Sequence, residues 1–188
     1  AGVYQLSSGE LYFESKKATF NTPSEALKNG IVMVFQENSL VPNMTVSQNL
    51  YLGAEKYFNS LARLNIRASR FLQSLNFNVD PNLLVSQLGA AQKQMVEIAR
   101  AVHHNAKVII FDEPTATLTP EEKHHFFSLM KRLKVQGVSI VFISHALEEA
   151  LQNSDRITVL RDGEIIVTDL ASKFTRERIV KAMIGRDL

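Results

Sequence analysis

The chain of 188 residues has no cysteine, no tryptophan and no long apolar segment. Without cysteine it cannot form disulfides, thiolate zinc sites or a cysteine nucleophile. Its longest uninterrupted apolar run is Ile31–Phe35, whereas a membrane-spanning helix needs about 20 apolar residues. No basic and apolar leader opens the sequence. We therefore expect a chain that does not cross a membrane by itself and that works in the cytosol.

An excess of charge of either sign is also missing. The 21 Lys and Arg residues nearly balance the 19 Asp and Glu residues, which leaves a net charge of +2, and the basic residues are scattered. Nucleic-acid-binding proteins obtain affinity from clustered phosphate contacts, so no nucleic-acid partner is expected. The hydrophobic share of 45% is that of an ordinary globular protein, and this length can bury one core without disulfides or metals.

The first half of the chain predicts two strands followed by a helical block. Alternation at 10–14 and the fully apolar run 31–35 predict strands, and a short helix is expected between them at 23–30. Over 46–102 the pattern is mainly helical and is interrupted by a turn at 80–82. One apolar helix face is expected from Leu61, Leu64, Ala68, Phe71, Leu72 and Leu75.

The second half alternates strands and helices. Strands are predicted at 108–111 and 138–143, with a helix at about 120–134 between them, and this order implies a parallel pair. The pattern continues with a helix at 146–151, a strand at 156–160, a turn at Asp162–Gly163, a strand at 164–168 and a helix capped by Thr175. The sequence therefore predicts the α/β class with a parallel sheet.

Acidic and imidazole side chains follow two of these strands. Asp112 and Glu113 come directly after the run 108–111, and His145 lies two residues beyond the strand 138–143. Ligands of parallel α/β sheets bind outside the carboxyl ends of the strands. An adjacent carboxylate pair there can hold the hydrated Mg²⁺ of a phosphate substrate and polarise an attacking water. A solvated turn is the alternative explanation for the pair.

Five segments, in order along the chain, resemble the motifs of the ATP-binding subunit of ABC transporters. They are Phe35–Glu37 (the Q-loop), Leu88–Ala101 (the signature loop and its helix), Phe111–Thr115 (Walker B), Ala116–Thr119 (the D-loop) and His145 (the switch histidine). The flanks 36–42 and 160–164 are most similar to the first ATPase half of ribose/galactose-type sugar importers. The resemblance covers nearly the whole chain.

This resemblance implies a fold. We expect a parallel-sheet RecA-like P-loop NTPase core with an inserted helical subdomain at about 45–103, which would carry the signature loop. Residues 1–188 would form a single, partial ABC ATPase domain whose N-terminal part is missing.

The resemblance also implies a role for each matching side chain. Asp112 would hold the Mg²⁺ of MgATP through its water shell, and Glu113 would be the general base or the water-orienting group for attack on the γ-phosphate. Gln36 would reach both the Mg²⁺ and the attacking water, and His145 would bind the γ-phosphate. The signature loop, which comprises Leu88, Gly89, Ala90, Ala91 and Gln92, would face the ATP held by a second ATPase half.

The implied partners are those of a sugar importer. The loop from Gln36 to about Asn43 would contact transmembrane permease subunits, and a sugar-binding protein would act with them indirectly. The protein would then lie peripherally on the cytoplasmic side of the cell membrane. The sequence does not indicate which sugar is carried, because the permease and the binding protein determine specificity in such systems.

The sequence departs from the family pattern at positions that bear on activity. It contains no G-x-x-x-x-G-K-[ST] phosphate loop, and none of its 11 lysines is followed by Ser or Thr. We therefore expect this chain alone to hydrolyse almost no ATP. Gly89 and Ala91 stand where the signature loop usually has serine and glycine, and Thr119 replaces the D-loop aspartate. We therefore expect that, of the two ATP sites that a pair of ATPase halves would form, one is weak.

Two alternatives belong to other functional classes. A non-catalytic interaction module would lack the phosphate loop by nature and would dock a partner through 36–43. A gene that encodes the loop upstream would argue against it. An ABC-type ATPase of DNA repair or translation would share the Walker B and signature motifs, and co-purified nucleic acid would support it.

The pairs His103–His104 and His124–His125 are expected at the surface, since neighbouring helix positions point about 100° apart and cannot easily share a metal.

Overall fold

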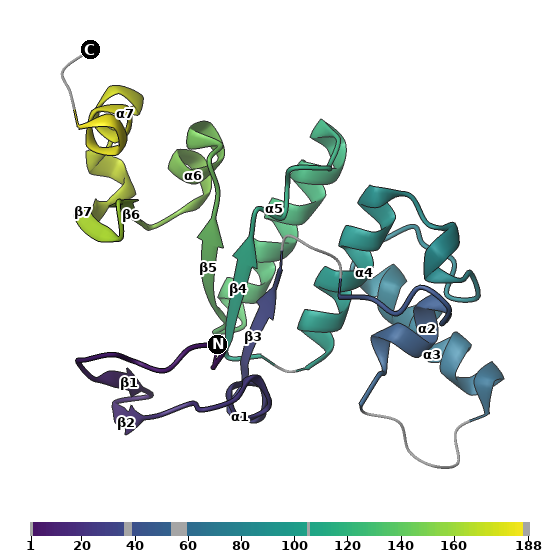
Figure 1. Ribbon diagram of the computed structural model, residues 1–188. Helices are drawn as coiled ribbons and strands as arrows, with labels where there is room; N and C mark the ends of the chain where they lie inside the picture. Colours follow the sequence, from purple (N-terminus) through teal and green to yellow (C-terminus); the bar gives the residue numbers. More distant parts are fainter. Residues whose placement is uncertain (1, 36–38, 54–59, 105, 186–188) are drawn as a thin grey trace. The chain divides into compact units, whose positions relative to one another are not determined.

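A computed structural model describes residues 2–35, 39–53, 60–104 and 106–185 (Figure 1). The chain divides into two compact units, Ala1–Val141 and Phe142–Leu188.

The first unit contains most of the strands and the long helices. Its strands are β1 (Leu11–Phe13), β2 (Lys16–Ala18), β3 (Ile31–Val34), β4 (Val108–Asp112) and β5 (Ser139–Ile143), the last of which runs across the division between the units. Its helices are α1 (Pro23–Lys28), α2 (Val46–Leu50), α3 (Leu61–Ser74), the short 3-10 helix η1 (Val85–Gln87), α4 (Ala90–His103) and α5 (Pro120–Val135).

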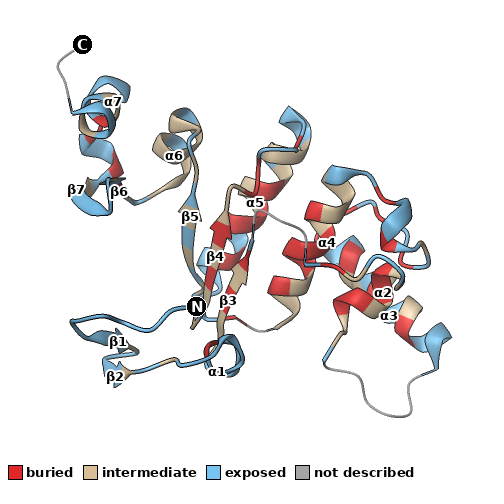
Figure 2. Cartoon of the chain, viewed as in Figure 1, coloured by how far each residue is buried: buried red, intermediate tan, exposed pale blue. Residues whose placement is uncertain are grey.

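The strands β3, β4 and β5 form one sheet in that order. β3 and β4 are parallel, with Val34 opposite Phe111. Both strands bury alternate side chains, Val32 and Val34 on β3 and Ile109 and Phe111 on β4, as the red segments of Figure 2 show. The ring of Phe111 meets Phe126 of α5 edge-on, with the ring centroids 5.2 Å apart. The predicted α/β class with a parallel sheet is confirmed.

Helices α2, α3 and α4 pack together within the stretch that the sequence predicts to be helical (Figure 1). The hydroxyl of Ser60 caps α3, which then buries Leu64, Ala68 and Leu72 on one face. Leu61, expected on the same face, is 59% exposed. It is the first residue of the helix, so it lies at the end of the buried face rather than within it.

The strand β2 is an element that the sequence pattern did not predict. It forms an antiparallel hairpin with β1, in which Leu11 pairs with Ala18. Glu14 and Ser15 turn the chain with φ angles of 50° and 62°. β2 has the sequence Lys-Lys-Ala and both lysines are exposed, so it lacks the alternation of apolar and polar residues from which a strand is predicted.

The second unit is a hairpin packed with two helices. Its elements are α6 (Leu147–Asn153), β6 (Arg156–Arg161), β7 (Glu164–Leu170), the 3-10 helix η2 (Ala171–Lys173) and α7 (Arg176–Ile184). β6 and β7 are antiparallel around the predicted turn Asp162–Gly163. The buried side chains Val159, Phe174 and Ile179 form the core, against which apolar residues of α6 pack. The hairpin and the last helix, capped by Thr175, are confirmed.

Candidate functional site

The carboxylate pair lies where β4 ends. Asp112 is the last residue of β4, and Glu113 directly follows it. Phe111 behind them is fully buried and anchors the strand, whereas both acidic residues are half-buried. Because β3 is parallel to β4, its carboxyl end at Val34 lies at the same edge of the sheet. Gln36, which is predicted to act at this edge, lies outside the described residues.

The backbone of Glu113 adopts a conformation that is unusual for a residue with a side chain. Its φ of 51° lies in the left-handed region, which costs a non-glycine residue about 1–2 kcal/mol. The next two residues, Pro114 and Thr115, are buried and fix the turn from within. Strain of this kind persists where the surrounding structure imposes it, and it is concentrated at functional sites. The sequence pattern did not reveal it.

Thr119 has a clear local role at the start of α5. Its hydroxyl accepts a hydrogen bond from the N–H of Glu122 at 3.3 Å, and the carboxylate of Glu122 accepts one from the N–H of Thr119 at 2.8 Å. This reciprocal capping box begins the helix, and Pro120 occupies its first position. Both threonine and aspartate are favoured N-cap residues, with aspartate the better of the two, so either residue at this position can begin the helix.

The signature loop leads into the first turn of α4. Leu88 is buried, and Gly89 is the N-cap residue, with its N–H donating to Oε1 of Gln92 at 3.3 Å. Gly89 has an ordinary φ of −67°, and a Cβ added there would meet no atom within 4 Å. Serine would therefore fit at this position, so the fold does not require the glycine. Ala90 and Ala91 occupy the first two helical positions, where unpaired backbone N–H groups favour anions.

His145 belongs to the second unit, whereas the carboxylates and the signature loop belong to the first. It is exposed and lies between β5 and α6. The preceding Ser144 accepts a hydrogen bond from the N–H of Ala146 at 3.0 Å, which shapes the turn into α6.

The donor groups at the end of β4 fit a magnesium ion that arrives with a phosphate substrate. Among the residues that the structure describes, no group of three or more His, Cys, Asp or Glu side chains is arranged to hold a metal. Mg²⁺ is commonly bound by one or two carboxylates, several waters and substrate phosphates. Asp112 and Glu113 offer carboxylate oxygens of this kind. They suit a Mg²⁺ ion whose remaining ligands are waters and the phosphates of the substrate.

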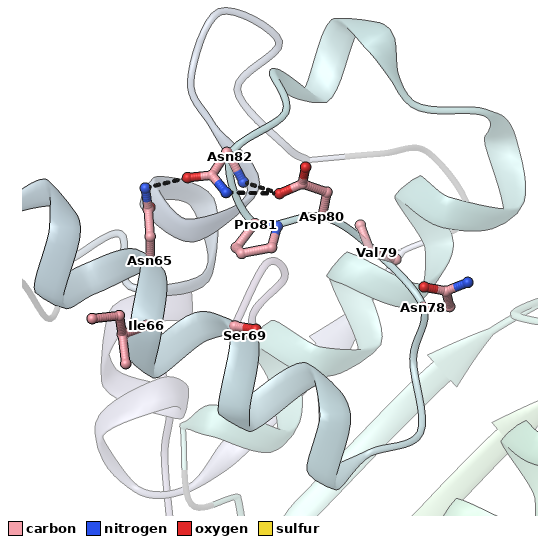
Figure 3. A pocket seen from close by; sticks show the side chains of 8 residues that line it. All are labelled: Asn65, Ile66, Ser69, Asn78, Val79, Asp80, Pro81 and Asn82. Carbon is pink, nitrogen blue, oxygen red and sulfur yellow. Dashed lines mark hydrogen bonds between the residues drawn. The ribbon is translucent and has the colours of Figure 1, made fainter.

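A pocket lies elsewhere in the first unit, among α3 and the turn that follows it (Figure 3). It has a volume of about 390 Å³ and is lined by Asn65, Ile66, Ser69, Asn78, Val79, Asp80, Pro81 and Asn82. A hydrogen-bonded chain runs along one side, from Asn65 to Asn82 and on to Asp80. None of the predicted site residues lines this pocket.

The histidine pairs have ordinary structural surroundings. His103, at the end of α4, packs edge-on against Tyr51 and Phe71, with ring centroids 4.6 and 5.5 Å away. Burial lowers the pKa of His103, and it also lowers the pKa of His104, where the charges of His103 and Arg100 act in the same direction. Both side chains are half-buried rather than fully at the surface.

Solved structures resemble this chain along nearly all of its length. A cassette of an ABC transporter in its ADP conformation has 28% identity and a TM-score of 0.74, and the match covers 96% of this chain and 74% of that one. A dimeric ATP-binding cassette with ADP and phosphate bound has 27% identity and a TM-score of 0.77 over 92% and 77% of the two chains. The fold is thus that of the ATP-binding cassettes, a RecA-like P-loop fold.

The family follows from the sequence as well. The ABC transporter family matches residues 1–116, which is more than half of the chain. The chain therefore belongs to the ABC transporter family. No helix among the described residues is long and apolar enough to span a membrane.

Curated relatives include sugar-import proteins. The galactose/methyl galactoside import ATP-binding protein MglA is 41% identical in Clostridium perfringens strain 13 and 40% identical in Escherichia coli K12, over 190 aligned residues. The whole of this chain is covered, but it spans only 37% and 38% of the length of these two relatives.

Proposed function

We propose that the protein to which this chain belongs hydrolyses ATP and thereby drives the import of a sugar. The carboxylate pair at the end of β4 carries this proposal, because Asp112 ends a parallel strand and Glu113 directly follows it in a chain of the ABC transporter family. The sugar class is taken from relatives named as galactose and methyl galactoside import proteins, which share about 40% of their residues with this chain over the matched region.

Each site residue receives a distinct role in this proposal. Bound Mg²⁺ would supply positive charge that offsets the charge developing on the phosphates. Asp112 would hold its water shell, and Glu113 would accept the proton of the attacking water. Gln36 would orient that water, and His145 would donate a hydrogen bond to the γ-phosphate. The backbone N–H groups at Leu88–Gln92 would bind the nucleotide held by a second ATPase half.

The proposed partners follow from the same assignment. We place permease contact on the loop from Gln36 to about Asn43, which leads into the helical subdomain at about 45–103. The dimeric cassette that this chain resembles supports pairing with a second ATPase half. A sugar-binding protein would act through the permease, and the protein would lie peripherally on the cytoplasmic side of the membrane.

The test is the release of phosphate from MgATP by two purified proteins, the 188-residue chain and the product of the whole gene. The chain alone should release phosphate at the background rate, because none of its lysines is followed by Ser or Thr as in a phosphate loop. The whole gene product should hydrolyse ATP, and Glu113→Gln should slow it by about 10²- to 10⁴-fold.

Glu121→Gln, the same chemical change at an exposed position of α5, is the matched control and should leave the rate unchanged. Turnover by the 188-residue chain that depends on Glu113 would contradict the predicted inactivity. A whole gene product that hydrolyses ATP equally well after Glu113→Gln would contradict the assigned base.

A further inference from the structure

A buried glutamate on α4 takes no part in the predicted site. Glu97 is 3% exposed, and its carboxylate binds the segment that leads from β3 to α2. The N–H of Ser39 donates to Oε1 at 2.6 Å, and the Ser39 hydroxyl donates to the same oxygen at 3.0 Å. Arg100, one turn further along α4, donates to Oε2 at 2.7 Å and reaches the carbonyl oxygen of Ser39 at 3.5 Å. Glu97 thus joins α4 to the segment that follows Gln36.

The rest of this segment is held independently by a second buried side chain. Asn49 of α2 is fully buried, and its Oδ1 accepts a hydrogen bond from the N–H of Val41 at 2.8 Å. Its Nδ2 donates to the carbonyl oxygens of Val41 and Thr45, at 3.1 and 3.0 Å. Backbone N–H groups of η1 donate to Pro42 and Met44. Residues 41–45 are therefore held by other contacts, whereas Ser39 is held by Glu97 together with Arg100.

A buried carboxylate needs an explanation, because its loss of hydration must be offset by charge and hydrogen bonds. The neighbouring α4 residues Val96, Ile98 and Ala99 are buried and apolar, so an apolar side chain at position 97 would suit this part of the helix. Packing alone does not account for the glutamate. Its hydrogen bonds to the Ser39 backbone do, since these fix where the chain passes over α4.

We propose that Glu97 is a positioning residue that holds Ser39, three residues after Gln36 in the sequence, on the helix of the signature loop, with Arg100 neutralising its charge. The functional meaning of this contact rests on the proposed role of Gln36. The contact between Glu97 and Ser39 does not depend on that role, because it is present in the chain without nucleotide.

The test is amide hydrogen exchange of the 188-residue chain without nucleotide, resolved residue by residue by NMR. Glu97→Ala removes the acceptor of the Ser39 N–H, so exchange at Ser39 should rise about tenfold to a hundredfold. Glu97→Gln keeps an acceptor oxygen but loses the pairing with Arg100, so it should give a smaller rise. Ser39→Ala should have a small effect alone and a still smaller one in the Glu97→Ala background, because the hydroxyl then has no carboxylate to bind and keeps only the hydrogen bond from Arg100.

Glu121→Ala, which removes an exposed carboxylate from α5, is the control and should leave Ser39 exchange unchanged. A role in overall stability alone would raise exchange uniformly, including at Ile110 in β4, and that result would overturn the proposal. Unchanged exchange at Ser39 would overturn it as well. If Glu97→Ala does not fold, the milder Glu97→Gln and Ser39→Ala variants carry the same comparison. Failure of the ATPase proposal would leave these exchange rates unaffected, so the two outcomes are distinguishable.

Discussion

At the scale of single residues, Glu113 combines a predicted catalytic role with a strained backbone. Its φ of 51° favours glycine, so the side chain is kept at a cost in stability. We predict that Glu113→Gly is more stable than Glu113→Ala by about 1 kcal/mol, because both remove the carboxylate and only glycine relieves the strain. Urea unfolding of the two variants measures the difference.

The comparison of glycine with alanine is internally controlled, since any contact of the Glu113 side chain is lost in both variants. Gly89→Ala is a useful second reference, because Gly89 has a φ of −67° and no strain to relieve. Equal stability of the two Glu113 variants would contradict the prediction, because the relief of strain would then be no larger than the entropy that glycine costs in the unfolded chain.

The sequence pattern could predict the position of polar residues that come directly after an apolar strand. Asp112 and Glu113 follow an apolar run, so their position at the end of β4 was predictable. Glu97 was not, because on a helix a glutamate between apolar residues gives no sign of the distant Ser39 that it binds. Asn49 was missed for the same reason: its partners lie in a loop, and loop contacts have no period.

At the scale of elements, the long helices and the apolar strands were predictable, and the polar β2 was not. Apolar runs predict the buried strands β3 and β4 directly. Threonine followed by proline likewise predicts the start of α5. β2 forms because the Glu14–Ser15 turn returns the chain alongside β1, and positive φ angles at Glu and Ser are not evident from sequence.

The carboxyl end of α4 gives a prediction about pH. Burial lowers the pKa of His103 and His104 in the folded chain below the value of about 6.5 in the unfolded chain. The unfolded chain therefore binds protons first as the pH falls through about 6.5. Stability should be unaffected by these groups well above that pH, fall as the pH drops through about 6.5, and level off once the lower folded-state pKa values are passed. Urea unfolding at several pH values measures this.

His103→Phe isolates the contribution of His103. Phenylalanine can keep the edge-on packing against Tyr51 and Phe71 but does not titrate, so the fall in stability below about pH 6.5 should become shallower. An exposed histidine, as in His145→Phe, provides the comparison. An unchanged slope in His103→Phe would mean that burial does not disfavour the charged imidazole at this position.

At the scale of the whole molecule, the proposal gives this chain one part of a nucleotide site. Its described residues offer the carboxylates at the end of β4 and the N-terminus of α4, and the chain spans 37% of the length of a curated relative. One solved ATP-binding cassette that resembles it is dimeric and holds ADP and phosphate. A signature loop that serves the nucleotide of a second half contributes nothing to binding by a single chain.

These considerations predict how the 188-residue chain responds to MgATP in a calorimetric titration. Without a phosphate loop among its residues, the chain lacks the lysine and the backbone N–H groups that neutralise most of the phosphate charge, so no binding tighter than about 1 mM is expected. Asp112→Ala should then give the same heats as the parent chain. Binding that is tighter than this and is lost in Asp112→Ala would contradict the prediction. It would mean that the carboxylates, with Gln36 and His145 or with a second copy of the chain, form a usable site by themselves.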